Sequence, residues 1–399
     1  MEGAPCSCIR AAPVGRLALV MHSNDQAYIT GVGAFLPGEP VPSAAMEDFI
    51  GRIGGRGSLM GRRALRWNGV ETRHYALSPG GRPNHSNAGM CALAVRRALD
   101  DAGLGPEDLG FLAAATTQGD FLVPGHAAMV HGELGCGPIE IASFQSVCAS
   151  SLMAAKSAYL SVRTGEHRVA AACAGEFSSR WFQPSFYEGS SLLDDKQRLK
   201  PQADYLRFTL SDGAGAVLVE PAPRPQGLSL RIRFIDMVSL AGQFDPCMWA
   251  GAGLESHAEA LDGWSHLGPQ AAHRAGGLAL LQDFDLLKRV IRAWVGVYLK
   301  KVDEGRIVPD EIDHLLCHYS ARSLREEIVS LLEKTNGMIP EEKWFSNLAT
   351  VGNVGSASIW VMLEAFLRSD RLKPGQTVLC VVPESGRSMV GFMLLEAVG

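Results

Sequence analysis

The chain lacks the features that mark several common classes of protein. It has no long basic run, and its 37 basic and 42 acidic residues give a formal net charge of -5, so a general nucleic-acid binder is not expected. No uninterrupted apolar stretch reaches the length that spans a membrane. With 47% hydrophobic and 20% charged residues over 399 positions, the composition is that of a globular protein large enough for two core-forming units.

The cysteines fit neither a disulfide framework nor a zinc site. They number nine, an odd count, and are scattered along the chain, which favours a reducing compartment and predicts a cytoplasmic protein. Cys6 and Cys8 form a C-x-C pair, but no second pair has the spacing of zinc ligands. No metal is therefore expected.

Residues 1–26 differ in character from the rest of the chain. Their apolar part is short and is interrupted by an arginine, which disfavours a signal peptide. We interpret this segment as a flexible or artefactual extension, with Met21 as an alternative start.

The chain repeats one pattern of elements at a fixed offset. A helical pattern over residues 90–103 precedes a Pro-acidic-acidic turn at Pro106 and the apolar run GFLAAAT. Another, over residues 284–300, precedes the same kind of turn at Pro309 and the run DHLLCH. The two turns are 203 residues apart. In both halves a helix, a further strand (IEIASF or WFSNLA), a tight turn and a helix of small residues come next in the same order.

This repeated alternation predicts an α/β protein made of two duplicated halves. Near-continuous apolar strands between helices indicate parallel or mixed sheets that are covered on both faces. We place the halves at residues 27–227 and 228–399, joined by the proline- and glycine-rich segment 222–227. In such folds the strand-to-helix turns gather functional groups at one end of the sheets.

Three polar residues follow strands at these turns. Cys148 lies in SFQSVCASS after IEIASF, His318 follows DHLLC, and Asn353 lies in the turn after WFSNLA. Each has an ordinary structural explanation, namely a small buried hydrophobe, a hydrogen-bonded core histidine and a turn residue. Their occurrence together at matching turns favours a catalytic site.

The three residue types suit acyl-transfer chemistry. The N-terminus of a helix favours a thiolate at Cys148, while His318 and Asn353 can donate hydrogen bonds to a thioester carbonyl. A backbone N–H of the loop PESGRS, around Gly386, would complete an oxyanion hole with that of Cys148, unless the loop is an ordinary turn. Hydrolysis and condensation both stay open at this point, since a Cys-His-Asn set serves either reaction.

From Tyr28 onward the sequence resembles the thiolase fold and, within it, the ketoacyl-acyl-carrier-protein synthase III enzymes, which use Cys, His and Asn. Besides the Cys148 turn and His318, the resemblance rests on ITGVGAFLPG (29–38), NGVETRHY (68–75), LSDGAGAVLVE (210–220), VGNVGSAS (351–358) and LKPGQTVL (372–379). It implies a thiolase-like fold in which the two halves form a layered α-β-α-β-α architecture.

The family resemblance also implies a reaction. An acyl group is transferred to Cys148, and a malonyl-type or ketoacyl thioester is activated as an enolate that His318 and Asn353 stabilise. The enolate attacks the acyl-cysteine, with the backbone N–H groups of Cys148 and Arg387 as the oxyanion hole. The substrates are acyl thioesters on acyl carrier protein or coenzyme A, and no cofactor is implied.

The same resemblance implies two kinds of partner. Members are usually homodimers, and the loop that reaches the partner's site corresponds to residues 121–124. Arg322 and Arg325, close to His318, would meet an acidic carrier protein. A solvated helix face is an equally good explanation of these two arginines.

The sequence departs from the housekeeping members of the family. RRALRW (62–67) does not match their coenzyme A-flanking residues, Tyr319 replaces a glutamine, PESGRS replaces a glycine triplet, and residues 250–277 are extra. Several segments resemble instead the ketosynthases of dialkylresorcinol and aryl-polyene gene clusters, which join two acyl chains, one a β-ketoacyl thioester, into a cyclohexanedione. These segments are RRALRWNG (62–69), HSNA (85–88), PGHAAMVHGELG (124–135), EKWFSNL (342–348) and VPESGR (382–387).

Two other functions stay open. One is an acyltransferase that moves an acyl group to oxygen or nitrogen through Cys148, and the other is a non-catalytic ketosynthase partner subunit. Asn353 favours condensation over the first, because such relatives often carry an acid there, and the intact set argues against the second. Other residues have no assigned role: Trp249 and Trp264 are interpreted as core or dimer contacts rather than tunnel walls, and His257, His266 and His273 as loop residues.

Overall fold

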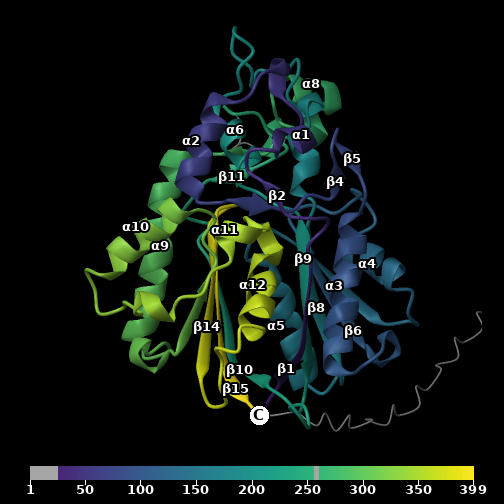
Figure 1. The fold of residues 1–399 in the computed structure, drawn as a ribbon, viewed down its shortest axis with the longest axis vertical. Coiled ribbons are helices and arrows are strands. Elements are labelled where there is room, and N and C mark those ends of the chain that lie inside the picture. Colours follow the sequence, from purple (N-terminus) through teal and green to yellow (C-terminus); the bar gives the residue numbers. More distant parts are fainter. Residues whose placement is uncertain (1–25, 256–259) are drawn as a thin grey trace, which may run out of the picture.

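A nine-stranded mixed sheet is the centre of the fold (Figure 1). The structure is a computed structural model and describes residues 26–255 and 260–399, so Cys6, Cys8, Met21 and His257 lie outside the described residues. The strand order is β13-β14-β15-β10-β1-β9-β8-β6-β7. In chain order these strands are β1 (Tyr28–Phe35), β6 (Phe111–Thr116), β7 (Glu140–Gln145), β8 (Ala170–Glu176), β9 (Gly213–Glu220), β10 (Ser229–Ser239), β13 (His314–Cys317), β14 (Thr377–Glu384) and β15 (Met389–Val398).

The two ends of the sheet have the same pairing pattern. In the first half, β8 pairs parallel with β6 and antiparallel with β9, which pairs antiparallel with β1. In the second half, β14 pairs parallel with β13 and antiparallel with β15, which pairs antiparallel with β10. The halves meet where Tyr28 and Ile29 of β1 pair with β10. The duplicated α/β architecture predicted from the repeat is therefore confirmed, while the boundary at 227/228 stays a prediction.

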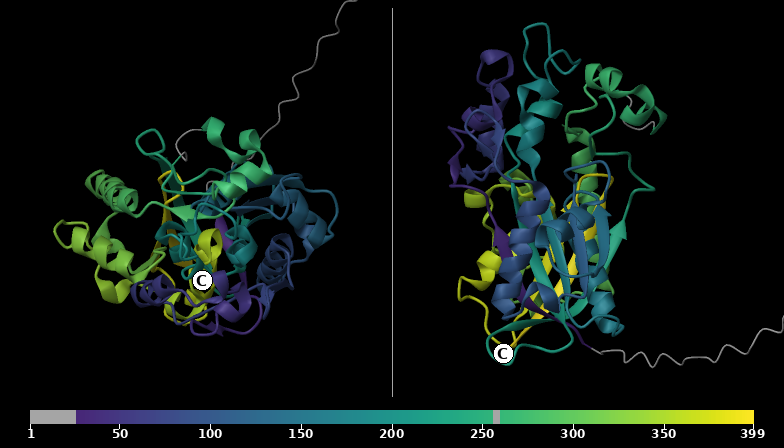
Figure 2. Two further views of the ribbon diagram at one scale, coloured as in Figure 1. Left: turned by 90° about the horizontal axis from the view of Figure 1, so that it is seen from above. Right: turned by 90° about the vertical axis from the view of Figure 1, so that its right-hand side faces the viewer.

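The helices form three layers around this sheet (Figures 1 and 2). Helix α5 contacts β6 and β8 of the first half and β10 and β15 of the second, and α12 contacts β1, β9 and β13, so both lie between the halves. Helices α3 and α4 cover the outer face of the first half, and α9 and α10 lie on the second. The six helices are α3 (Asn87–Ala102), α4 (His126–Leu134), α5 (Ser150–Arg163), α9 (Phe284–Asp303), α10 (Arg322–Leu332) and α12 (Ser358–Leu367). This is the predicted layered thiolase-like fold.

The glycine at position 215 of β9 allows α12 to pack closely against the sheet. Trp360 of α12 is fully buried and lies on the backbone of β9, where a Cβ added at Gly215 would come within 2.5 Å of the Trp360 Cβ. A helix can approach a sheet this closely only where the strand carries glycine.

Shorter elements gather beyond one end of the sheet, opposite the C-terminus (Figures 1 and 2). The helices there are α1 (Glu47–Ile50), α2 (Leu59–Asn68), α6 (Pro201–Arg207), α7 (Trp264–Leu267) and α8 (Pro269–Arg274). The remaining short pairs are β2 (Val41–Pro42) with β3 (Thr72–Arg73), β4 (Leu77–Ser78) with β5 (Arg82–Pro83), and β11 (Met248–Trp249) with β12 (Leu281–Gln282). In the part of the chain that the structure describes, no helix is both long and apolar enough to cross a membrane.

Two segments differ from their expected form. IEIASF is the edge strand β7, half-buried or exposed along its length, and not a covered strand. WFSNLA is not a strand beyond Trp344, which makes an isolated parallel bridge to Leu315. The chain then turns into the short helix α11 (Leu348–Val351), which brings Asn353 back to the end of the sheet.

Candidate active site

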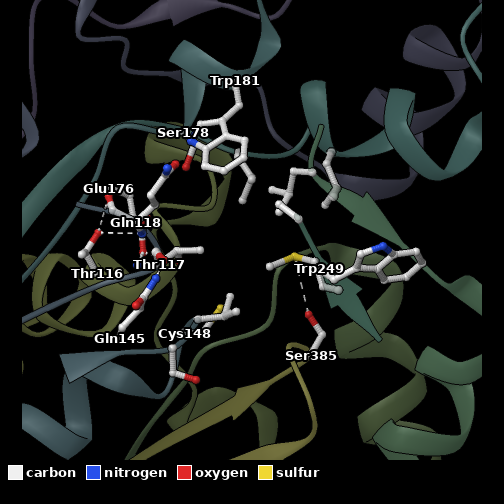
Figure 3. A pocket seen from close by; sticks show the side chains of 18 of the residues that line it. Thr116, Thr117, Gln118, Gln145, Cys148, Glu176, Ser178, Trp181, Trp249 and Ser385 are labelled. Atoms are coloured by element: carbon white, nitrogen blue, oxygen red, sulfur yellow. Dashed lines mark hydrogen bonds between the residues drawn. The ribbon is translucent and has the colours of Figure 1, made fainter. Parts of the chain in front are cut away.

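Cys148 lies in the turn between β7 and α5, and its residue is 7% exposed. The first turn of α5 is fixed locally, because Ser150 Oγ donates to the Val147 carbonyl at 2.7 Å and Ser151 Oγ to the Cys148 carbonyl at 3.0 Å. Figure 3 shows the Cys148 side chain on the wall of a cavity. Ser146 and Val147 line the same wall beside Cys148, whereas the small residues after it, Ala149, Ser150 and Ser151, are fully buried.

The expected thiolate at Cys148 is not what the structure favours. Burial raises the pKa of the thiol well above its ordinary value, and the carboxyl groups of Glu384 and Glu176 raise the pKa further. Loss of hydration and two nearby acidic groups outweigh the favourable end of the helix dipole. A nucleophile at this position would therefore rest as a neutral thiol and would lose its proton as it reacts.

His318 follows β13, and its backbone N–H donates to the Val381 carbonyl of β14 at 2.8 Å. Its residue is 5% exposed, and burial lowers the pKa of the imidazole to about 4. The ring is thus neutral near pH 7, with one nitrogen as a hydrogen-bond donor and the other as an acceptor. A neutral imidazole of this kind can accept the thiol proton or donate to a carbonyl oxygen.

Asn353 is held at the turn before α12 by its own carboxamide. The Oδ1 atom accepts from the Gly355 N–H at 2.9 Å, and the Asn353 carbonyl accepts from the Ser211 N–H at 2.8 Å. Because its oxygen is already engaged, the side chain offers its NH2 group to a ligand. Asn353 therefore acts as a donor and not as an acceptor toward the cavity that it lines.

One cavity of about 730 Å³ brings Cys148, His318 and Asn353 together. Its far wall is apolar, and Figure 3 shows Trp249 and Trp181 across from Cys148. Trp264 of the extra segment also lines it. The sequence favoured core or dimer contacts for Trp249 and Trp264, but both belong to the cavity wall. Five side chains on and near α9 and α10 extend the apolar surface: Leu280, Leu287, Ile291, Trp294 and Ile328.

Glu176 also lines the cavity and was missed from the sequence. It ends β8, is 4% exposed, and its Oε1 accepts from Thr117 and from Ser356 (Figure 3 shows the Thr117 side). Burial raises the pKa of this carboxyl group, and its hydrogen bonds oppose that shift. The sequence signal that could have pointed to Glu176 was a Gly-Glu pair at the end of an apolar strand.

The other predicted site residues, three arginines, are not among the residues that line this cavity. Arg387 is exposed and its Nε donates to the Phe244 carbonyl at 3.0 Å, while Ser385 of the same turn lines the cavity. Arg322 is exposed on α10, whereas Arg325 pairs with Glu341 at 2.5 Å. The assignment of Arg387 to the oxyanion hole and of both arginines to a carrier protein stays a prediction.

The loop at residues 121–124 borders the cavity with an unusual surface. Phe121, Leu122 and Val123 are 60%, 72% and 82% exposed, and three of its four residues, Phe121, Leu122 and Pro124, line the cavity. His273 binds the Glu188 carbonyl at 2.9 Å, and the described residues contain no group of His, Cys, Asp and Glu that could hold a metal.

Two family models match separate parts of the chain. The model for the C-terminal part of 3-oxoacyl-[acyl-carrier-protein] synthase III matches residues 302–395, which contain His318 and Asn353. The model for the N-terminal domain of beta-ketoacyl synthase matches residues 137–224, which contain Cys148. Each match thus contains candidate catalytic residues of one half, while other lining residues, such as Trp249 and Trp294, lie outside both matches.

Solved structures with the same fold are similar to nearly the whole chain. AbyA1, a tetronic acid condensing enzyme, is 22% identical with a TM-score of 0.72, and the match covers 93% of this chain and 99% of that one. 3-Oxoacyl-(acyl carrier protein) synthase III from Pseudomonas aeruginosa is 19% identical with a TM-score of 0.67, covering 93% and 98%. A variant of Xanthomonas campestris OleA with bound lauric acid and lauroyl-CoA is 18% identical with a TM-score of 0.69, covering 94% and 99%.

The fold is therefore that of the thiolase-like condensing enzymes. Each half of the chain is, in addition, similar over part of its length to a family model of ketoacyl synthases.

Proposed function

We propose that the protein is a condensing enzyme that takes an acyl group on Cys148 and joins it, by Claisen-type carbon–carbon bond formation, to a (β-keto)acyl thioester. The observation that carries this proposal is the single cavity lined by Cys148, a neutral His318 and the NH2 group of Asn353. A nucleophile and two hydrogen-bond donors around one apolar space suit two thioesters that react in turn.

In the first step the Cys148 sulfur attacks the thioester carbonyl of the donor. The thiol proton passes to the neutral His318 ring, and the backbone N–H groups of Cys148 and Arg387 stabilise the oxyanion. The carrier leaves as a thiolate and takes up the proton, so a thioester on Cys148 replaces the donor thioester. The acylated sulfur, like the neutral thiol that it replaces, adds no negative charge beside Glu176 and Glu384.

In the second step the acceptor thioester becomes an enolate, either by decarboxylation with release of carbon dioxide or by transfer of an α-proton to the neutral His318 ring. The enolate oxygen accepts hydrogen bonds from His318 and from the Asn353 NH2 group, whose orientation is fixed by Gly355. Its carbon attacks the acyl-cysteine carbonyl, a carbon–carbon bond forms and the bond from that carbonyl to sulfur breaks. The Cys148 thiolate then takes a proton from His318 in the deprotonation route, or from water in the decarboxylation route.

We propose that the physiological product belongs to dialkylresorcinol or related lipid and polyketide biosynthesis. The apolar walls around Trp249, Ile291 and Trp294 support acyl chains as substrates. The tryptophan of the extra segment, Trp264, lies on the same wall, which fits a site that differs from the housekeeping enzymes.

The carrier protein is proposed to approach over α2 and α10. These helices contact one another, and the Arg322 side chain lies close to Gly69, where an added Cβ would be 2.6 Å from its Nε. Arg62, Arg63 and Arg66 are also exposed on α2, so Arg322 belongs to a basic surface that suits an acidic carrier. Arg325, held by Glu341 and stacked over Trp344, suits that contact less well.

A homodimer is proposed because an unpaired strand edge and an exposed apolar loop lie next to each other in the first half. Strand β7 is an edge of the sheet, and edges are normally covered or protected. The exposed residues 121–123 belong to the cavity rim and would extend to a second copy.

Acylation of Cys148 is the test of this function. Intact-protein mass spectrometry after incubation with acyl-coenzyme A and acyl-carrier-protein donors should show a mass gain that Cys148→Ala lacks. A folded native protein that no donor acylates would refute the assignment and favour the non-catalytic subunit. An acyltransferase would also acylate Cys148 but would discharge it to oxygen or nitrogen.

A further inference from the structure

Two buried carboxylates end equivalent strands of the two halves. Glu176 is the last residue of β8 and Glu384 the last of β14, and they are 4% and 2% exposed. The pairing of β8 and of β14 is the same in both halves, so the two side chains occupy matching places in the duplicated fold. Neither acyl transfer to Cys148 nor the condensation step uses them as reacting groups.

Glu384 of the second half binds the nucleophile turn of the first. Its Oε1 accepts from Ser146 Oγ at 2.5 Å, and its Oε2 accepts from the Ala149 N–H at 3.0 Å. These two donors flank Cys148 on either side. The contact is close, since a Cβ added at Gly386 would lie 3.1 Å from Glu384 Oε1 and 2.9 Å from the Val147 side chain.

Glu176 of the first half binds the Asn353 turn of the second. Its Oε1 accepts from the Ser356 N–H at 3.2 Å and from Ser356 Oγ at 2.5 Å, three residues after Asn353. Thr117 supplies two more donors to the same oxygen, at 3.1 and 2.7 Å. Gly355 has a φ of 52°, and a Cβ there would lie 2.9 Å from Glu176 Cγ, so turn and carboxylate fit directly together.

We propose that Glu384 and Glu176 are reciprocal positioning residues, each of which fixes the catalytic turn of the other half. Glu384 sets the position of Cys148 for acyl transfer, and Glu176 sets the position of Asn353 for condensation. The proposal rests on the proposed function for what the two turns do. Buried carboxylates whose oxygens are satisfied by hydrogen bonds hold their donors in one geometry, and a displacement of about 1 Å in such a site costs about 10²-fold in rate.

Substitutions at Glu384 separate its hydrogen bonds from its charge. In Glu384→Gln the carbonyl oxygen can accept from Ala149 and the NH2 group can donate to Ser146 Oγ, so both contacts persist without charge. Glu384→Met has similar length and makes neither contact. Glu220→Gln is the matched control, because Glu220 also ends a strand and accepts from Thr30 Oγ at 2.6 Å, at the opposite end of the sheet.

The experiment measures acylation of Cys148 by mass, and the rate at which iodoacetamide alkylates the Cys148 peptide across pH. Glu384→Met should acylate about 10²-fold more slowly, whereas Glu384→Gln and Glu220→Gln should stay within a few-fold of the native rate. Because the Glu384 carboxyl group adds to the effect of burial in raising the thiol pKa, Glu384→Gln should also move the alkylation profile to lower pH. Glu220→Gln should leave that profile unchanged.

Glu176→Met should show the complementary defect. Its Cys148 should acylate at close to the native rate, while discharge of the acyl-enzyme by a β-ketoacyl thioester should slow by about 10²-fold. Equal loss of both steps in the Glu176 and Glu384 variants, in parallel with a lower midpoint of thermal unfolding, would overturn the proposal in favour of a merely structural role.

The alkylation measurement needs no acyl substrate. Native protein that no donor acylates would therefore refute the proposed function alone. An unchanged alkylation profile in Glu384→Gln, together with equal acylation rates in the Gln and Met variants, would overturn the positioning role even where the proposed function holds. If Glu384→Met fails to fold, Ser146→Ala replaces it, because this variant removes the Ser146 contact to Glu384. It should acylate more slowly than Glu220→Gln, and a rate equal to that control would overturn the positioning role.

Discussion

Replacing Asn353 by aspartate and by alanine should separate the chemistry of this side chain from its contribution to stability. In the native turn, Oδ1 accepts from the Gly355 N–H at 2.9 Å, and the proposed function assigns the NH2 group to the enolate. Aspartate keeps the acceptor and loses the donor, whereas alanine loses both. The two variants therefore remove different parts of one side chain.

The magnitudes of both effects are set by these two contacts. Loss of one preorganised donor to a developing oxyanion costs about 10²–10³-fold in rate, or about 2.7–4 kcal/mol. Asn353→Asp also adds a negative charge to a cavity that already contains Glu176, so its condensation rate should fall at least as far as that of alanine. Asn353→Ala leaves the buried Gly355 N–H without its partner, which costs about 1–3 kcal/mol of stability.

Acylation of Cys148 and discharge of the isolated acyl-enzyme are measured separately by mass, and stability is measured by denaturant unfolding. Both variants should acylate at close to the native rate and discharge at least about 10²-fold more slowly. The alanine variant should be the less stable and the aspartate variant at least as inactive. Native discharge rates in Asn353→Asp would refute the role of the NH2 group.

Three further outcomes are expected. Gly215→Ala should destabilise the protein by about 1–3 kcal/mol in denaturant unfolding, because its Cβ would lie 2.5 Å from the Trp360 Cβ. Gly132→Ala, in open space on α4, should not destabilise it, and equal effects of the two variants would contradict the packing argument. Since burial lowers the pKa of His318 to about 4, the ring loses its neutral form only as pH falls toward that value, and the condensation rate should show no His318-dependent inflection near 6.5 in comparison with His318→Gln. Leu122→Glu, at a residue that is 72% exposed, should shift a native dimer toward monomer in light scattering, and a native monomer would contradict the proposed interface.

The duplicated architecture was predictable because its signals are local. The Pro106 and Pro309 turns, the helices before them and the apolar strands after them are all set by short-range pattern. The strand-to-helix turns at Cys148 and His318 then had to lie at one end of the sheet, which needs only topology and no contact between particular side chains. Asn353 lines the same cavity, but it follows the short helix α11 and not the strand that the pattern predicted.

Features that depend on contacts between the halves were not predictable in the same way. Helix position argued for a thiolate at Cys148, but burial and two carboxyl groups from distant strands raise the pKa. The hydrogen bonds that Glu384 accepts from Ser146 and Glu176 accepts from Ser356 join residues 238 and 180 positions apart. Likewise, Arg325 and Arg322 are alike in the sequence, and only the fold places Glu341 beside Arg325. Such pairings depend on tertiary proximity, which residue pattern does not encode.

Discharge of the isolated acyl-enzyme tests the central claim most directly. The acyl group is placed on Cys148, excess donor is removed, and a carbon-13-labelled β-ketoacyl carrier protein is added. The account predicts that the mass of Cys148 returns to its native value and that the product contains both chains joined by a new carbon–carbon bond. Release of the acyl group as an ester, an amide or a free acid, with the labelled acceptor chain unchanged in carbon skeleton, would contradict it.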